Sequence, residues 1–411
     1  GGRNTSQQIA EMADWWRSAA EHHGGEFHVT ELQGGPNVRW GYPGFIEGPE
    51  IRIWTHQIIA HGAKAVLYHQ WRTAKFGGET GGFGILKADG TRTKRLEAIE
   101  QAGSEIKTII PELHSRKLLP KAAVAYLRSS DVQTYQEQGP PRTIAGQWEQ
   151  VRAELGHTHG LDSCQGAYQV LWNYYNPSAF IFESHLEKGE MPYNVILLPN
   201  PYVLTRAQAQ NLIKFVESGG TLVTESRFGT KNENAHLHET PLLEEMLGIS
   251  SEHIETIDDR VYIPKLRCWA YGFRDLIHTE TEHLMEYKDG LPAFIEKKIG
   301  NGKVLYATFS LFMSIGKTGN ERLADYVREY LPKPEFFLKD KDHIEMILWQ
   351  DGNSPLLYVI NHSPSKDKFE IDTPENFKIA RDLLSGNTFE IEKGKLPLVM
   401  GGRCVMVLIL S

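Results

Sequence analysis

The segment Phe27-His28-Val29-Thr30-Glu31-Leu32-Gln33-Gly34-Gly35-Pro36 decides how the first part of the chain folds. Its first residues are typical of a short strand, and the glycines and proline that follow are typical of a loop. Alternation along a strand predicts that Phe27, Val29 and Glu31 share one face, so we expect the glutamate on the apolar, inward side. A carboxylate there is costly to bury. The segment therefore indicates either a functional carboxylate at a strand end or a glutamate that turns into solvent.

The composition limits the class of protein. A chain of 411 residues exceeds one ordinary hydrophobic core, so it predicts about two or three domains. Hydrophobic residues make up 40% and charged residues 23%, which is typical of a folded globular protein. A net charge of −8 argues against a nucleic-acid partner, because binding nucleic acid needs a basic face. No apolar run is long enough to cross a bilayer, so we expect no membrane partner.

The cysteines and the chain start carry little functional signal. Cys164, Cys268 and Cys404 are isolated, without a CxxC pair or a histidine at metal-ligand spacing. We therefore expect packing roles for them, and neither a disulfide framework nor a metal site. The chain opens Gly1-Gly2-Arg3-Asn4, without a methionine or a signal-like apolar stretch, which indicates a fragment or a processed chain. The sequence does not indicate a cellular compartment.

Residues 1–117 alternate helical and strand patterns. Helices are predicted at Ser6–His22, Pro49–His61 and Thr93–Ile110, and strands around Glu31 and at Ala63–Trp71. This order predicts two neighbouring strands of a parallel sheet. Two strands cannot close a barrel, so the segment fits only the last quarter of a (β/α)₈ barrel, a fold of about 250 residues.

The loops after these two strands hold most of the aromatic and charged residues of this part. The first loop carries Trp40, and the second carries Arg72, Phe76 and Glu79. In a parallel barrel both loops open on the carboxyl face, where active sites are built. Aromatic rings mixed with carboxylates and an arginine suit a sugar, because its apolar faces stack on rings while its hydroxyls bond charged groups. The alternative is structural, with the rings as loop or core anchors and Arg72 as a salt-bridge partner.

Residues 118–332 show a second α/β pattern. Strands are predicted at Ala122–Leu127, Val195–Pro199 and Thr221–Thr224, and helices at Ile144–Leu155 and Ala207–Glu217. The alternation predicts a doubly wound parallel sheet of flavodoxin or amidotransferase type. No cysteine lies at a strand-to-helix elbow, and no G-x-G-x-x-G opens a helix. We therefore expect neither amidotransferase chemistry nor a dinucleotide, and no cofactor.

The alternation of helix and strand patterns ends at Leu331-Pro332-Lys333-Pro334. Residues 333–411 contain short apolar runs between turn residues, at Ile344–Trp349, Pro355–Ile360, Phe369–Ile371 and Cys404–Leu410. Such runs predict a small antiparallel β-sandwich. We expect His362, which follows one of the strands, to bond locally rather than to bind a ligand.

Several blocks of the first part resemble glycoside hydrolase family 42, the retaining β-galactosidases. After Glu31, the Gly-Pro loop and Trp40 come, in the family's order, Pro49-Glu50-Ile51-Arg52-Ile53-Trp54, Ala60-His61-Gly62-Ala63, Leu67-Tyr68-His69-Gln70-Trp71-Arg72 and Phe76-Gly77-Gly78-Glu79. The resemblance implies that Glu31 is the nucleophile at the end of the seventh barrel strand. It also implies that Trp40 and Glu79 line the galactose subsite, where we expect Arg72 and Phe76 as well. The family usually has a histidine three residues after the matching glutamate, and Gly82 stands there, which leaves the preference between galactose and related sugars open.

The later parts resemble the same family. Ser218-Gly219-Gly220-Thr221-Leu222-Val223, Asn232-Glu233-Asn234 and Leu242-Leu243-Glu244-Glu245-Met246-Leu247-Gly248 are similar to its trimerisation domain, and they imply a homotrimer formed through residues 118–332. Residues 333–411, with Asn361-His362-Ser363, are similar to its C-terminal β domain.

The resemblance implies a mechanism that needs a second carboxyl group. A retaining glycosidase places a nucleophile and a general acid/base about 5 Å apart. In the family the acid/base follows an asparagine at the end of the fourth barrel strand, which this chain lacks, and Glu79 lies in the wrong loop for it. We therefore expect the chain alone to be inactive although its parent is a glycosidase. The alternative is a non-catalytic carbohydrate-binding or scaffolding protein derived from a glycosidase, and the reading frame upstream of Gly1 would distinguish the two.

Overall fold

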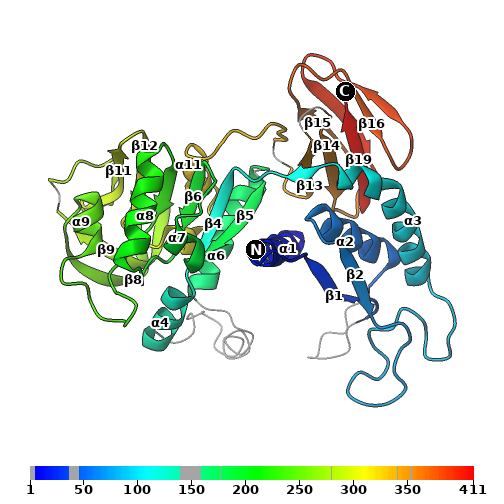
Figure 1. Cartoon of the computed structure of the whole chain (residues 1–411), viewed down its shortest axis with the longest axis horizontal. Coiled ribbons are helices and arrows are strands. Elements are labelled where there is room, and N and C mark those ends of the chain that lie inside the picture. Colours follow the sequence, from blue (N-terminus) through cyan, green and yellow to red (C-terminus); the bar gives the residue numbers. More distant parts are fainter. Residues whose placement is uncertain are drawn as a thin grey trace. The chain divides into compact units, whose positions relative to one another are not determined.

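The structure is a computed structural model, shown in Figure 1. It describes residues 5–36, 46–138, 159–175, 177–278, 280–339, 341–351 and 354–411. These residues form two compact units. The central unit is Pro120–Lys333, and the split unit combines the residues up to Leu119 with Pro334–Ser411.

The first part of the split unit has the predicted order of helices and strands. It consists of α1 (Thr5–His22), β1 (His28–Gln33), α2 (Gly48–Ala60), β2 (Ala65–His69) and α3 (Lys94–His114). β1 and β2 pair in parallel. Local signals set the helix starts: a capping box at Glu47 precedes α2, and the Thr93 hydroxyl accepts from the backbone N–H of Leu96 in α3.

The second part of the split unit is antiparallel. β13 (Ile344–Gln350), β14 (Leu356–Asn361), β16 (Ile379–Asp382), β17 (Thr388–Glu390), β19 (Cys404–Leu410) and the short β3 (Lys117–Leu118) form a six-stranded sheet. β15 (Asp367–Asp372) and β18 (Lys395–Met400) form a second, two-stranded sheet. The order of the large sheet is β17-β16-β19-β14-β13-β3, so the chain leaving α3 adds its own edge strand.

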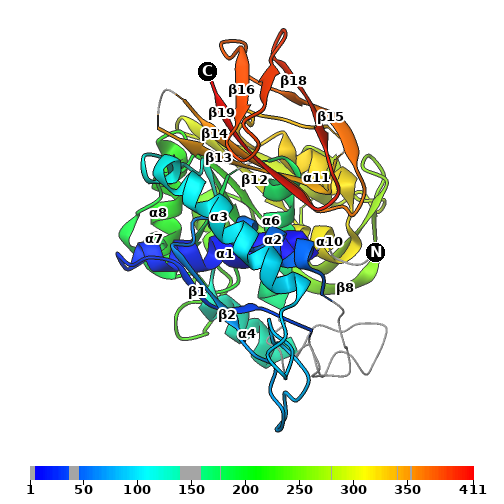
Figure 2. The same cartoon turned by 90° about the vertical axis from the view of Figure 1, so that its right-hand side faces the viewer.

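One hydrophobic core joins the two parts of the split unit. Phe27 just before β1, Val29 of β1 and Ile59 of α2 belong to the same buried cluster as Trp349 and Tyr358 of the six-stranded sheet. The Trp349 indole donates to the backbone carbonyl of Ala60 (2.8 Å). Figure 2 shows the sheet standing over α2 and α3. The sheet therefore packs on the helices that support β1 and β2.

The central unit is a doubly wound domain. β4 (Ala122–Tyr126), β5 (Ser178–Phe182), β6 (Val195–Leu198), β7 (Thr221–Thr224) and β12 (Gly302–Ala307) are parallel, in the order β5-β4-β6-β7-β12. β11 (Pro292–Ile299) and β10 (Met285–Glu286) extend the sheet antiparallel at the β12 edge. Strand order 2-1-3-4-5 for the parallel strands is the flavodoxin-like arrangement.

Helices cover both faces of this sheet. One hydrophobic cluster joins alternate residues of β4, such as Ala123 and Ala125, to α7 (Glu183–Lys188), α8 (Arg206–Glu217) and α9 (Leu242–Leu247). On the other face Tyr168 of α6 (His159–Asn173) stacks on Phe180 of β5, and α6 packs on α4 (Arg128–Gln138), α10 (Leu311–Thr318) and α11 (Glu321–Arg328). The helix expected at Ile144–Leu155 lies outside the described residues.

A long hairpin in the central unit was not predicted from the sequence. β8 (Ser251–Ile263) and β9 (Cys268–Ile277) pair antiparallel after α9. The pairing shifts register twice along β8. These irregularities interrupt the period-2 pattern that identifies a strand in a sequence.

Candidate active site

β1 and β2 present one face that the helices do not cover. The side chain of Val66 packs in the shared core, and the Tyr68 hydroxyl lies 2.7 Å from the Thr55 hydroxyl of α2, so both residues face the helices. Alternation then places Leu67 and His69 on the opposite face, where the Leu67 side chain is 54% exposed. We call this side of the two strands the open face.

Glu31 is exposed, in contrast to the expectation from the sequence. The β1–β2 register shifts between Val29 and Leu32, so Leu32 returns to the helix-facing core while Thr30 and Glu31 are exposed. The prediction that Glu31 shares the face of Phe27 and Val29 is therefore wrong, because a bulge interrupts the alternation. The carboxylate near the end of β1 is therefore accessible to solvent.

The loops after β1 and β2 are held directly against each other. The Gly34 N–H donates to the His69 carbonyl (2.7 Å), and the Phe83 N–H donates to the Pro36 carbonyl (2.8 Å). A Cβ at Gly35 would lie 2.4 Å from the Gly84 carbonyl oxygen, so only glycine permits this approach. The ends of both strands thus open at one place, as predicted for a carboxyl face.

The base of the second loop is fixed to the strand and to α3. The Gln70 N–H donates to the Phe83 carbonyl and the Ile85 N–H to the Gln70 carbonyl, both at 2.8 Å. Ile85 and Leu86 are buried against Leu96 of α3. Residues 71–82 therefore form a long loop, called the excursion below, that leaves the end of β2 and returns to it.

Glu79, on this excursion, reaches back to the end of β2. Its Oε2 lies 3.1 Å from Nε2 of His69, the last residue of the strand. The two side chains are 32% and 33% exposed. The structure thus brings Glu79 to the strand end beside the one that carries Glu31. Sequence reasoning did not select His69, although its place at a strand end before the second loop was a usable signal.

The other predicted substrate residues have different surroundings. The Arg72 Nε donates to the Ala88 carbonyl (2.9 Å), although the side chain stays exposed. One nitrogen of the guanidinium is thus bonded to the backbone of the same loop. The Phe76 ring is 87% exposed on the excursion. Trp40 lies outside the described residues. Their roles in substrate binding remain predictions.

A cluster of buried polar groups lies at the carboxyl ends of β6 and β7 in the central unit. Glu225 accepts from the backbone N–H groups of Asn200 (2.6 Å) and Phe312 (2.8 Å), and burial raises its pKa to about 7. The Arg227 guanidinium lies between the rings of Tyr202 and Phe273 and donates to the Asn200 side chain (2.6 Å). Doubly wound folds bind ligands at this edge. Here Glu225 and Arg227 are only 2% and 5% exposed, so they tie the strand ends together inside the protein.

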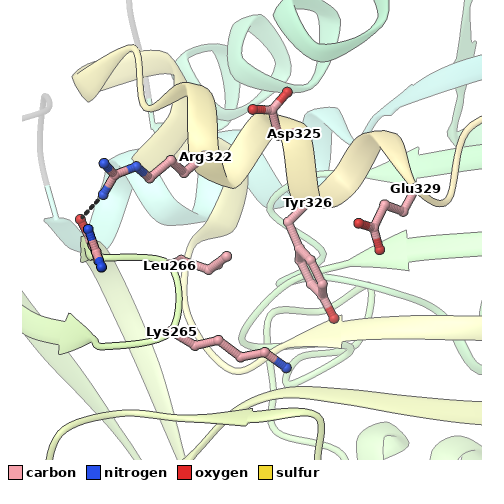
Figure 3. A pocket seen from close by; sticks show the side chains of 7 residues that line it. Lys265, Leu266, Arg322, Asp325, Tyr326 and Glu329 are labelled. Carbon is pink, nitrogen blue, oxygen red and sulfur yellow. Dashed lines mark hydrogen bonds between the residues drawn. The ribbon is translucent and has the colours of Figure 1, made fainter.

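The central unit also contains a hollow of about 500 Å³ between the β8–β9 turn and α11 (Figure 3). Figure 3 shows Lys265 and Leu266 of the turn facing Tyr326 of the helix. Its remaining lining residues are Arg267, Arg322, Asp325 and Glu329, and Arg322 donates to the Arg267 carbonyl (3.4 Å). The lining contains both cations and carboxylates, but no nucleophile beside a base. The hollow belongs to a different unit from Glu31.

The described residues were also searched for a metal centre and for a membrane-spanning helix. Among them, no group of three or more histidine, cysteine, aspartate or glutamate side chains is arranged to bind a metal ion. No helix in the described part of the chain is long and apolar enough to span a membrane. Cys164 and Cys268 are buried, and burial raises the pKa of the Cys268 thiol to about 11.

Two family models match the chain. Residues 2–109 match a model described as beta-galactosidase, of glycoside hydrolase family 42, and residues 149–333 match that family's beta-galactosidase trimerisation domain. The first match includes the strands and loops that carry Glu31 and Glu79. The second lies within the bounds of the central unit, Pro120–Lys333.

Similar proteins agree with these matches. Beta-galactosidase BgaA of Planococcus sp. is 24% identical over 373 residues, which cover 85% of this chain and 51% of that protein. Beta-galactosidase BgaA of Clostridium cellulovorans is 26% identical over 381 residues, covering 87% and 52%. The chain thus spans about half the length of these curated relatives.

Solved structures show the same fold. The beta-galactosidase from Bacillus circulans sp. alkalophilus aligns with a TM-score of 0.74 at 22% identity, covering 94% of this chain and 55% of that one. The beta-galactosidase from Halorubrum lacusprofundi aligns with a TM-score of 0.73 at 18% identity, covering 98% and 55%. The predicted fold class, a barrel end followed by further α/β and β parts, is confirmed. The chain belongs to glycoside hydrolase family 42 and corresponds to the C-terminal portion of that family's β-galactosidases.

Proposed function

We propose that the chain is part of a retaining glycoside hydrolase for β-galactosides or related sugars, with Glu31 as its nucleophile. The observation that carries this proposal is the exposed Glu31 carboxylate beside the strand end that holds the Glu79–His69 pair. A sugar on the open face would meet a carboxylate from β1 and a second one from the loop after β2. The names of the two relatives described above, both β-galactosidases, support the substrate class.

The chemistry proceeds in two displacements. In the first, a Glu31 oxygen attacks the anomeric carbon, the bond to the leaving oxygen breaks, and a glycosyl ester forms on Glu31. A general acid gives its proton to the leaving oxygen. In the second, the same group takes a proton from water, which attacks the anomeric carbon and frees Glu31. Net retention of configuration follows from the two inversions.

The general acid/base belongs outside these 411 residues in this proposal. It must lie about 5 Å from Glu31 and face it across the sugar. Glu79 is bonded to His69 on the neighbouring strand end, and we assign it to the sugar hydroxyls. The chain alone should therefore bind sugar without hydrolysing it at a useful rate.

The central unit is proposed to assemble three copies of the chain. Support comes from its match to the trimerisation domain of the family. Light scattering on this chain should then give a mass near three times 46.6 kDa. A monomer at micromolar concentration would count against assembly through this unit.

An assay with an aryl β-galactoside tests the catalytic proposal. The proteins are this chain and a longer one that includes the upstream barrel strands, the latter also with Glu31→Gln and with Glu100→Gln. Glu100 is a matched control, because it is an exposed glutamate of α3 that pairs with Arg92, just before the helix. We expect Glu31→Gln to lower kcat on the order of 10⁴-fold or more, and Glu100→Gln to leave it unchanged. Robust turnover by Glu31→Gln, or by this chain alone, would overturn the assignment.

A further inference from the structure

The loop after β2 returns to its strand through Phe83–Leu86, which we call the return segment. This segment is bonded to the end of β2 and to the loop after β1, as described above. A second set of contacts comes from the start of α3. There the Thr93 hydroxyl donates to the Ile85 carbonyl (2.6 Å), and Nη2 of Arg95 donates to the Gly84 carbonyl (2.9 Å). Helix α3 thus holds the segment that joins the two loops.

The Gly84 carbonyl lies where these contacts meet. Gly84 is buried, and its carbonyl lies so close to Gly35 of the first loop that no Cβ fits on Gly35. No Cβ fits on Gly84 either, because it would collide with the Thr73 hydroxyl. Among the described residues, Arg95 is the only hydrogen-bond donor to this carbonyl. A shift of Gly84 would therefore displace the loop that follows Glu31.

The surroundings of Arg95 are costly for a cation. Its Nη2 also lies 3.5 Å from the Ile85 carbonyl, and its Nε is buried without an acceptor among the described residues. No carboxylate in the described part of the chain pairs with it. Burial without a counter-ion lowers the pKa of Arg95. A neutral donor would avoid this cost, whereas a charged donor bonds the carbonyl more strongly and so fixes it more firmly.

We propose that Arg95 is a positioning residue for the sugar site: from α3 it fixes the Gly84 carbonyl, and through it the spacing of the loops after β1 and β2. This inference rests on the proposed function and names the residue that holds its two loops together. Arg95 acts through the return segment and takes no part in bond breaking. Glu31 lies on β1, before the first loop. The loss of Arg95 should therefore weaken sugar binding more than it slows the chemical step.

Two substitutions separate the donor from the bulk of the side chain. Arg95→Met keeps an apolar stem and removes the donor, whereas Arg95→Lys keeps a cationic donor. In the longer protein we expect Arg95→Met to raise KM for an aryl β-galactoside about tenfold with little change in kcat, the effect of one lost hydrogen bond. Arg95→Lys should restore KM to within about threefold. Arg92→Met is the control, because Arg92 is exposed and pairs with Glu100 (2.6 Å), so both constants should stay unchanged.

Hydrogen exchange on the 411-residue chain tests the inference without any sugar. The reporters are the N–H groups of Gly34 and Phe83, which lie at the contacts between the two loops, and that of Ala102, which is fully buried in α3. We expect Arg95→Met to speed exchange at Gly34 and Phe83 about tenfold and to leave Ala102 unchanged. Exchange reports on the loops even if Glu31 is not the nucleophile. Failure of this inference is therefore seen apart from failure of the proposed function.

Three kinds of result would overturn the inference. Unchanged exchange at Gly34 and Phe83 would show that Arg95 does not hold the loops. Equally faster exchange at Ala102, or a variant that does not fold, would assign Arg95 to the stability of α3 alone. Faster exchange in the loops with an unchanged KM, or equal rises in KM for the Met and Lys variants, would show that this hydrogen bond does not govern sugar binding.

Discussion

Glu345 is the residue whose replacement should damage the split unit most. It lies on β13, is 3% exposed, and accepts from the side chains of Gln57 (2.8 Å), His61 (2.8 Å) and His362 (2.7 Å). The other ring nitrogen of His61 bonds Asp14 of α1 (2.9 Å). One buried carboxylate thus connects the helices behind β1 and β2 to the six-stranded sheet.

The magnitude follows from the electrostatics of this network. Burial alone would raise the pKa of Glu345, but hydrogen bonds from His362 and His61 hold it at about 2. Burial alone would lower the pKa of His61, but Asp14 and Glu345 raise it from 6.5 to about 10. A net rise of that size, after the cost of burial, corresponds to about 5 kcal/mol in favour of the charged imidazole in the folded state. Removing one partner from a buried ion pair costs about 3–5 kcal/mol, because the remaining charge stays buried. We expect Glu345→Gln to lower the free energy of unfolding of the split unit by that amount.

Urea unfolding monitored by hydrogen exchange of the β13 amides measures this loss without mixing in the central unit. Glu100→Gln serves as the control, since its ion pair with Arg92 is more than half exposed and should contribute about 0–1 kcal/mol. If Glu345→Gln destabilised β13 no more than Glu100→Gln does, the network would not hold the unit together. The reasoning would then be refuted.

Three further outcomes can be checked by unfolding measurements, the last together with kinetics. The pKa of His61 is raised from 6.5 to about 10, so its protonation stabilises the folded state fully below pH 6.5. The split unit should therefore lose stability as pH rises from 6.5 through about 10. Urea titrations at several pH values would show this loss. The pKa of Glu225 is raised from 4.5 to about 7, so the folded central unit favours the protonated carboxyl. The difference in unfolding free energy between the unchanged chain and its Glu225→Gln variant should therefore fall by about 3 kcal/mol from pH 4 to pH 8. A difference that stayed constant would contradict the burial of Glu225. Gly35→Ala should lower the free energy of unfolding by about 1–3 kcal/mol and raise KM, because the added methyl group meets the Gly84 carbonyl. Gly103→Ala is the control: Gly103 has open space around it, so this change should not destabilise α3.

Local sequence patterns predicted helices and strands well where the residues that define an element lie within it or next to it. The helix expected at Pro49–His61 is α2, Gly48–Ala60, because proline and a capping glutamate mark its start. The strand at Thr221–Thr224 is β7, bounded by Gly219-Gly220. Buried apolar runs and glycine stops are properties of short windows of sequence, so they need no knowledge of the tertiary structure.

The site depended on features that no short window contains. The bulge that exposes Glu31 arises from how β1 registers with β2, which alternation along one strand cannot reveal. The contact of His69 with Glu79 requires the excursion to fold back on its own strand. The pairing of His61 with Glu345 joins residues 284 positions apart, and His362, expected to bond locally, bonds Glu345 instead. Long-range partners of this kind are set by packing rather than by local sequence.

The central claim, that Glu31 forms the glycosyl ester, is tested most directly by trapping that ester. The longer protein is incubated with an activated 2-deoxy-2-fluoro-galactoside, which slows the second displacement more than the first, and its peptides are analysed by mass spectrometry. The account predicts one sugar bound to the peptide that contains Glu31, and no labelling of the Glu31→Gln variant. A sugar attached to a different carboxylate, or equal labelling of the variant, would contradict it.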